Sequence, residues 1–308
     1  MPASAGAVLQ RATARLRRAG IDTARLDAEV LLAHASGMTR TRLMALDGAP
    51  LSDSALSAFE AGLVRRVRRE PLAYVIGRQE FWSLDFEVTP AVLIPRPETE
   101  RVVETALSLV SARIAEAGQA GSAAASATAV RVADAGTGSG CIAIALAHEL
   151  PGAAVWATDA SAAALVIARR NAVRLGVADH IQFARGDLLA PIAAAAPFDL
   201  ICSNPPYVAE AQMGSLQPEL SYEPAAALFA ANDGLAVIRR LINQAPALLA
   251  PTGWLLVEIG CGQASEVSGL ARAAGFAHVE LRDDYAGIAR VLVAGNRRPP
   301  TGERGGEG

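Results

Sequence analysis

Residues 130–140 read Val-Arg-Val-Ala-Asp-Ala-Gly-Thr-Gly-Ser-Gly, and their pattern indicates the fold class. The run from Val130 to Asp134 is typical of a short buried strand, and the glycines after it allow the backbone to turn sharply. The apolar run from Ile142 to Leu150 predicts a helix directly after the turn. A strand, a glycine turn and a helix in this order form the first half of a βαβ unit.

The alternation of strands and helices continues along the rest of the chain. Further strands are predicted at 153–159, 181–183, 198–202, 254–258, 279–281 and 289–294, and further helices at 162–175, 235–249 and 264–274. Alternation of this kind predicts an α/β fold, in which helices cover both faces of a parallel sheet.

The chain before this unit has a different pattern. Residues 1–75 carry apolar side chains at helical spacing and predict a small helical bundle, and residues 80–88 predict a β-hairpin. We therefore expect an amino-terminal helical domain (1–75), a hairpin and linker (76–97), an α/β domain (98–295) and a disordered tail (296–308). The Ala/Ser/Gly-rich stretch 118–129 is expected to be a flexible insertion.

Charge is distributed unevenly along the chain, whose net charge is -3. Residues 1–80 hold 12 Arg and 8 acidic residues, a net of +4, and residues 81–308 hold 16 Arg and 23 acidic residues, a net of -7. The arginines at 65, 66, 68 and 69 could face an acidic partner, or they could form an ordinary solvated helix face. Direct binding to nucleic acid is not expected, because the larger domain is acidic.

The three cysteines, Cys141, Cys202 and Cys261, are far apart and lie in apolar segments. Their spacing matches no metal site, and buried free thiols fit a reducing compartment. We see neither a secretory signal nor a membrane span. The expectation is a cytoplasmic protein, a monomer, that holds no metal.

Glycines and strand-end carboxylates together predict the cofactor. The predicted loop residues are Asp134, Gly136, Thr137, Gly138, Ser139 and Gly140, with Asp159 and Asp187 at the next two strand ends. The spacing G-x-G-x-G differs from the G-x-G-x-x-G that cradles a pyrophosphate. A carboxylate before the glycines suits a cationic ligand, and Asp159 stands where a carboxylate can bind a ribose diol. A lone Asp is more often a turn residue, but the whole series predicts S-adenosylmethionine.

A second motif follows the strand that ends at Cys202. It reads Ser203-Asn204-Pro205-Pro206-Tyr207. The two prolines restrict the backbone before them, so the loop carbonyls are aimed with little freedom. Asn204 can accept a hydrogen bond from an NH2 group, and Tyr207 offers a flat face for a planar group. The alternative is a proline-stiffened turn; the functional interpretation predicts a planar amino group as the target.

These motifs resemble those of a known family. The chain is similar to class I S-adenosylmethionine-dependent methyltransferases and, more closely, to the release factor glutamine methyltransferases. The resemblance covers about residues 8–294 and is carried by Ile94-Pro95-Arg96-Pro97-Glu98-Thr99-Glu100, by 134–140 and by Asn204-Pro205-Pro206-Tyr207. Supporting matches are Glu80-Phe81-Trp82, Tyr222-Glu223-Pro224 and Asp233-Gly234-Leu235.

The resemblance implies a Rossmann-like, mostly parallel sheet of seven strands, and methyl transfer to the side-chain amide nitrogen (N5) of glutamine in the Gly-Gly-Gln motif of class I peptide chain release factors. It implies catalytic roles for Asn204, Pro205, Pro206 and Tyr207, which would also bind substrate together with Arg96. Asn204 and Leu188 would additionally contact the cofactor, with Leu188 where some relatives carry Trp. The helical domain would recognise the release factor.

Two other enzyme classes share the Asn-Pro-Pro-Tyr loop. Ribosomal-protein glutamine methyltransferases tend to lack the continuation seen at Pro97 to Glu100, and adenine-N6 nucleic-acid methyltransferases would need a strongly basic face. A binding protein that kept the fold without catalysis is a third alternative, which the intact Asn204 and Tyr207 disfavour.

Overall fold

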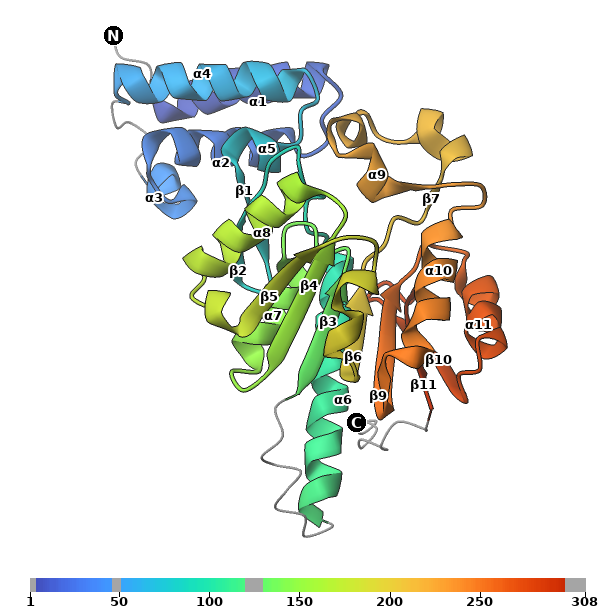
Figure 1. Ribbon diagram of the computed structural model, residues 1–308. Coiled ribbons are helices and arrows are strands. Elements are labelled where there is room, and N and C mark those ends of the chain that lie inside the picture. The colour runs from blue at the N-terminus through green and yellow to red at the C-terminus, as the bar shows by residue number, and fades with distance from the viewer. Residues whose placement is uncertain (1–3, 46–50, 120–129, 297–308) are drawn as a thin grey trace, which may run out of the picture. The chain divides into compact units, whose positions relative to one another are not determined.

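The computed structural model describes residues 4–45, 51–119 and 130–296 (Figure 1). The chain forms two compact units, the first made of residues 1–78 with 216–222 and the second of residues 79–215 with 223–308. The part of the predicted insertion at 120–129 and the part of the predicted tail at 297–308 lie outside the described residues.

The first unit is the helical bundle that the spacing of apolar residues predicts. Its helices are α1 (Ala5–Arg18), α2 (Ala24–Ser36), α3 (Arg40–Ala45), α4 (Asp53–Val67) and α5 (Leu72–Ile76). Serine side chains cap two of them, since Ser4 Oγ accepts from Ala7 N and Ser52 Oγ accepts from Ala55 N. Leu16, Leu32 and Leu63 are fully buried between these helices and form part of the bundle's core.

A distant segment completes the first unit. The 3₁₀ helix η5 (Pro218–Tyr222) carries Glu219, whose carboxylate accepts from Arg66 at 2.9 Å and from Arg69 at 2.7 Å. The Arg66 guanidinium also donates to Asp27 at 2.7 Å, and its side chain is only 7% exposed. Arg66 is therefore a buried structural cation. It is neither part of a solvated helix face nor exposed for contact with a partner.

Two more of the arginines at the end of α4 are engaged within the same unit. Arg65 pairs with Glu70 and donates to the backbone carbonyls of Tyr74 and Val75. Arg69, besides its bond to Glu219, donates to the Gly20 carbonyl. Most of the basic excess at this helix end thus serves the fold of the bundle.

The predicted hairpin opens the second unit. Its strands are β1 (Arg78–Phe81) and β2 (Leu84–Glu87), joined by Trp82 and Ser83. Both turn residues have positive φ, 53° and 57°, as a two-residue type I′ turn requires. Phe81 and Phe86 are buried and meet edge to face at 6.0 Å, which anchors the hairpin on the core.

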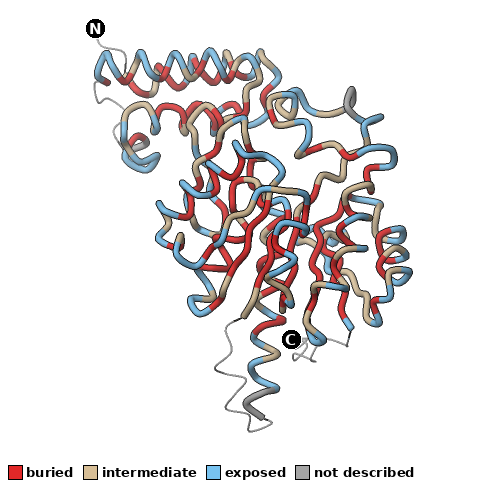
Figure 2. Tube along the Cα trace, in the orientation of Figure 1, coloured by how far each residue is buried: buried red, intermediate tan, exposed pale blue. Residues whose placement is uncertain are grey.

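The sheet of the second unit has seven strands, as expected. They are β3 (Arg131–Ala135), β4 (Ala154–Asp159), β5 (Ile181–Arg185), β6 (Phe198–Ser203), β9 (Leu249–Glu258), β10 (His278–Asp283) and β11 (Ala289–Gly295). Their order in the sheet is β10-β11-β9-β6-β3-β4-β5, and β11 runs antiparallel to both neighbours. Figure 2 shows buried residues concentrated along these strands.

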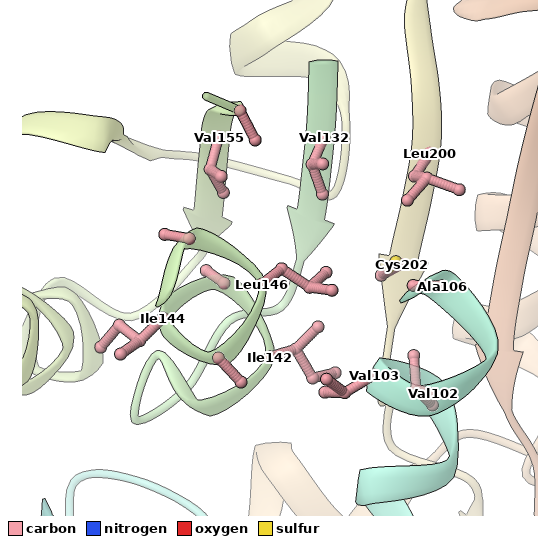
Figure 3. Packing of buried hydrophobic residues seen from close by; sticks show 14 of the residues in the cluster. Val102, Val103, Ala106, Val132, Ile142, Ile144, Leu146, Val155, Leu200 and Cys202 are labelled. Carbon is pink, nitrogen blue, oxygen red and sulfur yellow. The ribbon is translucent and has the colours of Figure 1, made fainter. Parts of the chain in front are cut away.

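Helices cover both faces of the sheet (Figure 1). One face packs against α6 (Glu100–Gln119), α7 (Cys141–Glu149) and α8 (Ala162–Arg174), and the other against α10 (Ala236–Gln244) and α11 (Ala264–Ala273). Figure 3 shows Val132, Val155 and Leu200 of three strands directed toward the α6 and α7 side chains. Ala133 and Ile201, one position further along their strands, face the opposite cluster. This alternation is the period of two that a strand imposes.

The structure differs from the predicted elements mainly between β6 and β9. The predicted helix 235–249 ends at Gln244, and the 3₁₀ helix η6 (Ala245–Ala247) follows because Pro246 cannot donate a helical hydrogen bond. The short elements of this region were not predicted: β7 (Val208–Ala209), η4 (Glu210–Ser215), η5, α9 (Ala225–Leu228) and β8 (Phe229–Ala230).

Elsewhere η1 (Pro97–Thr99), η2 (Ala178–His180) and η3 (Ala190–Ala195) are further 3₁₀ helices. Among the described helices, none is long and apolar enough to cross a membrane.

Candidate active site

A cavity of about 340 Å³ opens where the strand order reverses. The chain runs outward from β3 to β4 and β5 on one side, and β6 and β9 lie on the other. Ligands of open α/β sheets bind at such a switch point, beyond the carboxyl ends of the strands. Predicted site residues that line the cavity are Gly136, Thr137, Gly138, Ser139, Asp159, Asp187, Leu188, Asn204 and Pro206. The other predicted residues, Arg96, Asp134, Gly140, Pro205 and Tyr207, lie outside the described lining.

The three glycines of the loop have two different tasks. Gly136, Gly138 and Gly140 all have positive φ, at 75°, 56° and 86°. A Cβ added at Gly136 or Gly138 would meet no described atom within 4 Å, so these two leave open space along the cavity. A Cβ at Gly140 would lie 2.8 Å from Ile144 Cδ1, so this glycine permits close packing of the helix that follows.

Asp134 faces its own loop. Its Oδ2 accepts hydrogen bonds from Thr137 Oγ1 at 2.6 Å and from Ala143 N at 3.2 Å, which ties the glycine loop to the start of α7. Its Oδ1 is buried without a hydrogen-bond partner among the described residues. Burial raises the pKa of this carboxyl to about 7, although both hydrogen bonds act in the opposite direction. An additional donor could therefore be accommodated at Oδ1.

The two other strand-end carboxylates lie at the cavity. Asp159 accepts from Gly138 N at 2.9 Å and from Ser161 N at 2.8 Å, so backbone amides fix its orientation. Asp187 is 60% exposed and forms an ion pair with Arg240 of α10, a lining residue that sequence reasoning missed. Each carboxylate oxygen keeps a lone pair that could accept a ligand hydroxyl or amino group.

Asn204 begins a chain of hydrogen bonds that passes through Thr99, which also lines the cavity, to Glu258 and Tyr207 outside the lining. Its Nδ2 donates to Thr99 Oγ1 at 2.9 Å, and Thr99 Oγ1 donates to Glu258 Oε2 at 2.6 Å. The other carboxylate oxygen, Glu258 Oε1, accepts from the Tyr207 hydroxyl at 3.2 Å. Residues from η1, the loop after β6 and the end of β9 are joined in this way.

Tight packing holds the backbone of the Asn-Pro-Pro-Tyr loop. The Tyr207 carbonyl accepts from Gln263 Nε2 at 2.9 Å, and Gln263 Oε1 accepts from Gly260 N at 2.8 Å. Gly234 has a φ of 83°, and a Cβ there would lie 2.5 Å from the Tyr207 carbonyl oxygen. Only glycine fits at that position, which explains the Asp-Gly-Leu motif after the loop.

Arg96 is held by a buried acid. The guanidinium forms an ion pair with Glu223, whose other oxygen accepts from Ile94 N at 3.0 Å. The Glu223 side chain is only 1% exposed. The pair joins the Ile-Pro-Arg-Pro stretch to the Tyr-Glu-Pro motif, so Arg96 has a local partner instead of a place in the cavity wall.

Three polar residues of this region were not predicted as site residues: Thr99, Glu223 and Glu258. Glu258 ends β9 as Asp159 ends β4, and this strand-end position was the sequence signal that could have identified it as a site residue. Thr99 and Glu223 stand inside motifs that the resemblance singled out, but spacing alone did not assign them a contact. Among the described residues, no group of three or more His, Cys, Asp and Glu could hold a metal ion.

Comparison with known proteins identifies the family. The release factor glutamine methyltransferase of Moorella thermoacetica is 42% identical over 94% of this chain and 97% of its own length. The chain belongs to the release factor glutamine methyltransferase family. The Geobacter sulfurreducens member is 43% identical over 90% of this chain and 91% of its own. The protein is therefore a methyltransferase that uses S-adenosylmethionine, and the family membership that the motifs predicted is confirmed.

Two family models match separate parts of the chain. A PrmC N-terminal domain matches residues 7–77, and a methyltransferase small domain matches residues 122–230. Among solved structures, the hMettl16 catalytic domain in complex with a MAT2A 3′UTR hairpin has a TM-score of 0.55 at 19% identity, covering 83% of this chain and 87% of that one. This likeness concerns the fold alone.

The residues at the cavity fit a nucleoside with an amino-acid tail. The open space beside Gly136 and Gly138 lets a ligand approach the backbone closely. The Asp159 carboxylate is held in place by a hydrogen bond from Gly138 N. Outside the cavity lining, Asp134 Oδ1 is buried without a hydrogen-bond partner among the described residues, and this acceptor suits a cationic group. A cavity of this size lies at the lower end of those that enclose small ligands.

Gly138→Ala is expected to weaken cofactor binding by at least about tenfold, which corresponds to about 1.4 kcal/mol. The new methyl group would project into the open space from which the ligand approaches the backbone. Positive φ adds a stability cost of about 1–2 kcal/mol. Calorimetric titration with S-adenosylhomocysteine measures the affinity.

Gly176→Ala is the matched control for this variant, since Gly176 has a φ of 76° and equally open surroundings away from the cavity. The control should lose similar stability and bind the ligand normally. Equal affinities for both variants would contradict the role given to Gly138.

Proposed function

We propose that this protein transfers the methyl group of S-adenosylmethionine to the side-chain amide nitrogen of the glutamine in the Gly-Gly-Gln motif of class I peptide chain release factors. Family membership supports the substrate class. One observation of the site carries the chemistry: Asn204 lines the cavity while its Nδ2 donates to Thr99. Its Oδ1 is therefore the atom available to accept from a substrate NH2 group.

An amide nitrogen is a poor nucleophile because its lone pair is delocalised into the carbonyl group. Two acceptors, Asn204 Oδ1 and the Pro205 carbonyl, would hold the substrate NH2 with its lone pair directed at the reacting carbon. They would also stabilise the positive charge that develops on the nitrogen in the transition state. The cofactor supplies an electrophilic methyl group, and holding both reactants in line supplies the proximity contribution.

Other residues would bind and orient the two reactants. We assign the ribose diol to Asp159, the adenine amino group to Asp187 and the adenine face to Leu188. The loop from Asp134 to Gly140 would hold the amino-acid tail. Pro206 and Tyr207 would shape the glutamine site, and Arg96 would hold the adjoining loop through its ion pair with Glu223.

The remaining proposals concern the protein partner, the oligomeric state and the cellular compartment. The helical domain, residues 1–75, would recognise the release factor. The enzyme would act as a monomer in the cytoplasm, where translation terminates, without metal and without binding nucleic acid directly.

The test is mass spectrometry of a purified class I release factor after incubation with the full-length protein and labelled S-adenosylmethionine. One methyl group on the Gly-Gly-Gln glutamine is the expected product. A release factor with glutamate at this position is the matched control, since it keeps the shape of the side chain and lacks the reactive NH2.

Two results would contradict the proposal. Labelling of the glutamate control would place the methyl group elsewhere on the factor. If the factor stays unmodified although calorimetry shows that the cofactor binds, the substrate would instead be a ribosomal protein or adenine in a nucleic acid. Both can be tested in the same assay.

A further inference from the structure

A buried carboxylate lies behind Asn204. Glu258 at the end of β9 is fully buried, and its two oxygens accept from Thr99 Oγ1 at 2.6 Å and from the Tyr207 hydroxyl at 3.2 Å. A buried carboxylate is costly unless its oxygens are hydrogen-bonded. Its two partners, Thr99 and Tyr207, belong to the motifs 94–100 and 204–207, although Glu258 itself does not line the cavity.

The direction of each hydrogen bond follows from the charge of Glu258. An ionised carboxylate has no proton to donate, so the Thr99 hydroxyl must donate to it. Thr99 Oγ1 is then left only as an acceptor, and only the NH2 end of the Asn204 carboxamide can pair with it. The Oδ1 end consequently faces the cavity.

We infer that Glu258 is a positioning residue that acts through Thr99 to determine which end of the Asn204 carboxamide faces the substrate. This inference rests on the proposed function for its catalytic consequence. Protonated at Oε2, Glu258 would donate to Thr99 Oγ1, and the Thr99 proton would turn toward Asn204. The carboxamide would then present Oδ1 to Thr99 and its NH2 to the cavity, where it cannot accept from a glutamine NH2.

The charged surroundings of Glu258 place this switch near neutral pH. Burial, reinforced by the negative charge of Glu98, raises the pKa of Glu258 to about 7, while the bonds from Thr99 and Tyr207 and the positive charge of Arg290 oppose the rise. Burial and the charge of Glu258 together raise the pKa of the Tyr207 hydroxyl, and burial likewise raises that of the Cys141 thiol, so both stay neutral. The orienting, ionised form of Glu258 therefore predominates above its pKa and is lost below it.

The first test removes the connecting hydroxyl. Thr99→Val keeps the shape of the side chain, and should lower kcat by about 10- to 100-fold through misorientation of Asn204. The KM for the release factor and the affinity for S-adenosylhomocysteine should change far less than kcat. Thr99→Ser restores the hydroxyl and should recover most of the lost kcat, which a simple packing defect would not allow.

The second test is a pH profile. The wild-type kcat should rise from about pH 5.5 and level off above the pKa of Glu258, whereas Glu258→Gln should give a lower and flat profile. Asp134→Asn is the control, because burial raises the pKa of Asp134 to about 7 as well. An inflection that persists in Glu258→Gln and disappears in Asp134→Asn would overturn the inference.

A third measurement separates this inference from the proposed function. The NH2 signals of Asn204, assigned by their absence from the Asn204→Ala spectrum, should titrate with a midpoint at about pH 7 in the wild-type ¹⁵N NMR spectrum and not in Glu258→Gln. Titrating signals without methyl transfer to the release factor would refute the proposed substrate alone. Signals that do not titrate would refute the positioning role, whatever the substrate.

Discussion

Asn204→Ala is expected to lower kcat for methylation of the release factor by about 10²- to 10³-fold, the loss typical of removing one preorganised group that stabilises transition-state charge. The truncation removes Oδ1, the proposed acceptor for the substrate NH2, and leaves Thr99 Oγ1 without its donor. Pro205 and the rest of the loop remain held through Tyr207 and Gln263, so the cavity should keep its shape.

Single-turnover kinetics with labelled S-adenosylmethionine measures this loss without interference from product release. Asn243→Ala is the matched control, since Asn243 is an exposed residue of α10 outside the cavity lining. We expect normal turnover from the control and near-normal affinity for S-adenosylhomocysteine from both variants. A decrease in kcat of less than about fivefold in Asn204→Ala would contradict a role for Asn204 in stabilising the transition state, because its contact would then contribute under about 1 kcal/mol.

The architecture of the second unit could be predicted because the pattern of apolar residues along the chain shows which segments are buried. Strands buried on both faces leave apolar runs, and β3, β4 and β6 are such strands. The region between β6 and α10 could not be predicted in the same way. Its elements are two to six residues long, too short for a period to be recognised, and Glu219 finds its partner Arg66 at a separation of 153 residues.

The candidate site shows the same division. Residues that line the cavity through their own backbone or strand-end position, such as Gly138 and Asp159, could be predicted from spacing. Residues that act through another side chain could not. Sequence indicates that Thr99 can begin a helix, but not that its hydroxyl lies between Asn204 and Glu258. Asp134 was predicted to bind the cofactor; its Oδ2 accepts from Thr137 of its own loop, and its Oδ1 has no hydrogen-bond partner among the described residues.

Arg66→Ala is expected to destabilise the helical bundle by about 3–5 kcal/mol, the usual cost of removing one partner from a buried ion pair. The Arg66 and Asp27 side chains are 7% and 4% exposed, and their bond is 2.7 Å long. Without Arg66 the Asp27 carboxylate would remain buried with its principal donor lost, whereas Glu219 would keep Arg69. Hydrogen exchange of α2 and α4 amides in the full-length protein measures the effect in the unit where it arises.

Arg15→Ala is the control for this prediction. Arg15 pairs with Glu60 at 2.6 Å, but the two side chains are 39% and 52% exposed, so its loss should cost no more than about 1 kcal/mol. The double variant Asp27→Ala/Arg66→Ala should be more stable than Arg66→Ala alone, since no unpaired carboxylate remains buried. If the double variant were instead less stable by the full cost of Asp27→Ala, the two residues would be acting independently, and the bundle would depend on the packing of the Arg66 side chain and not on its charge.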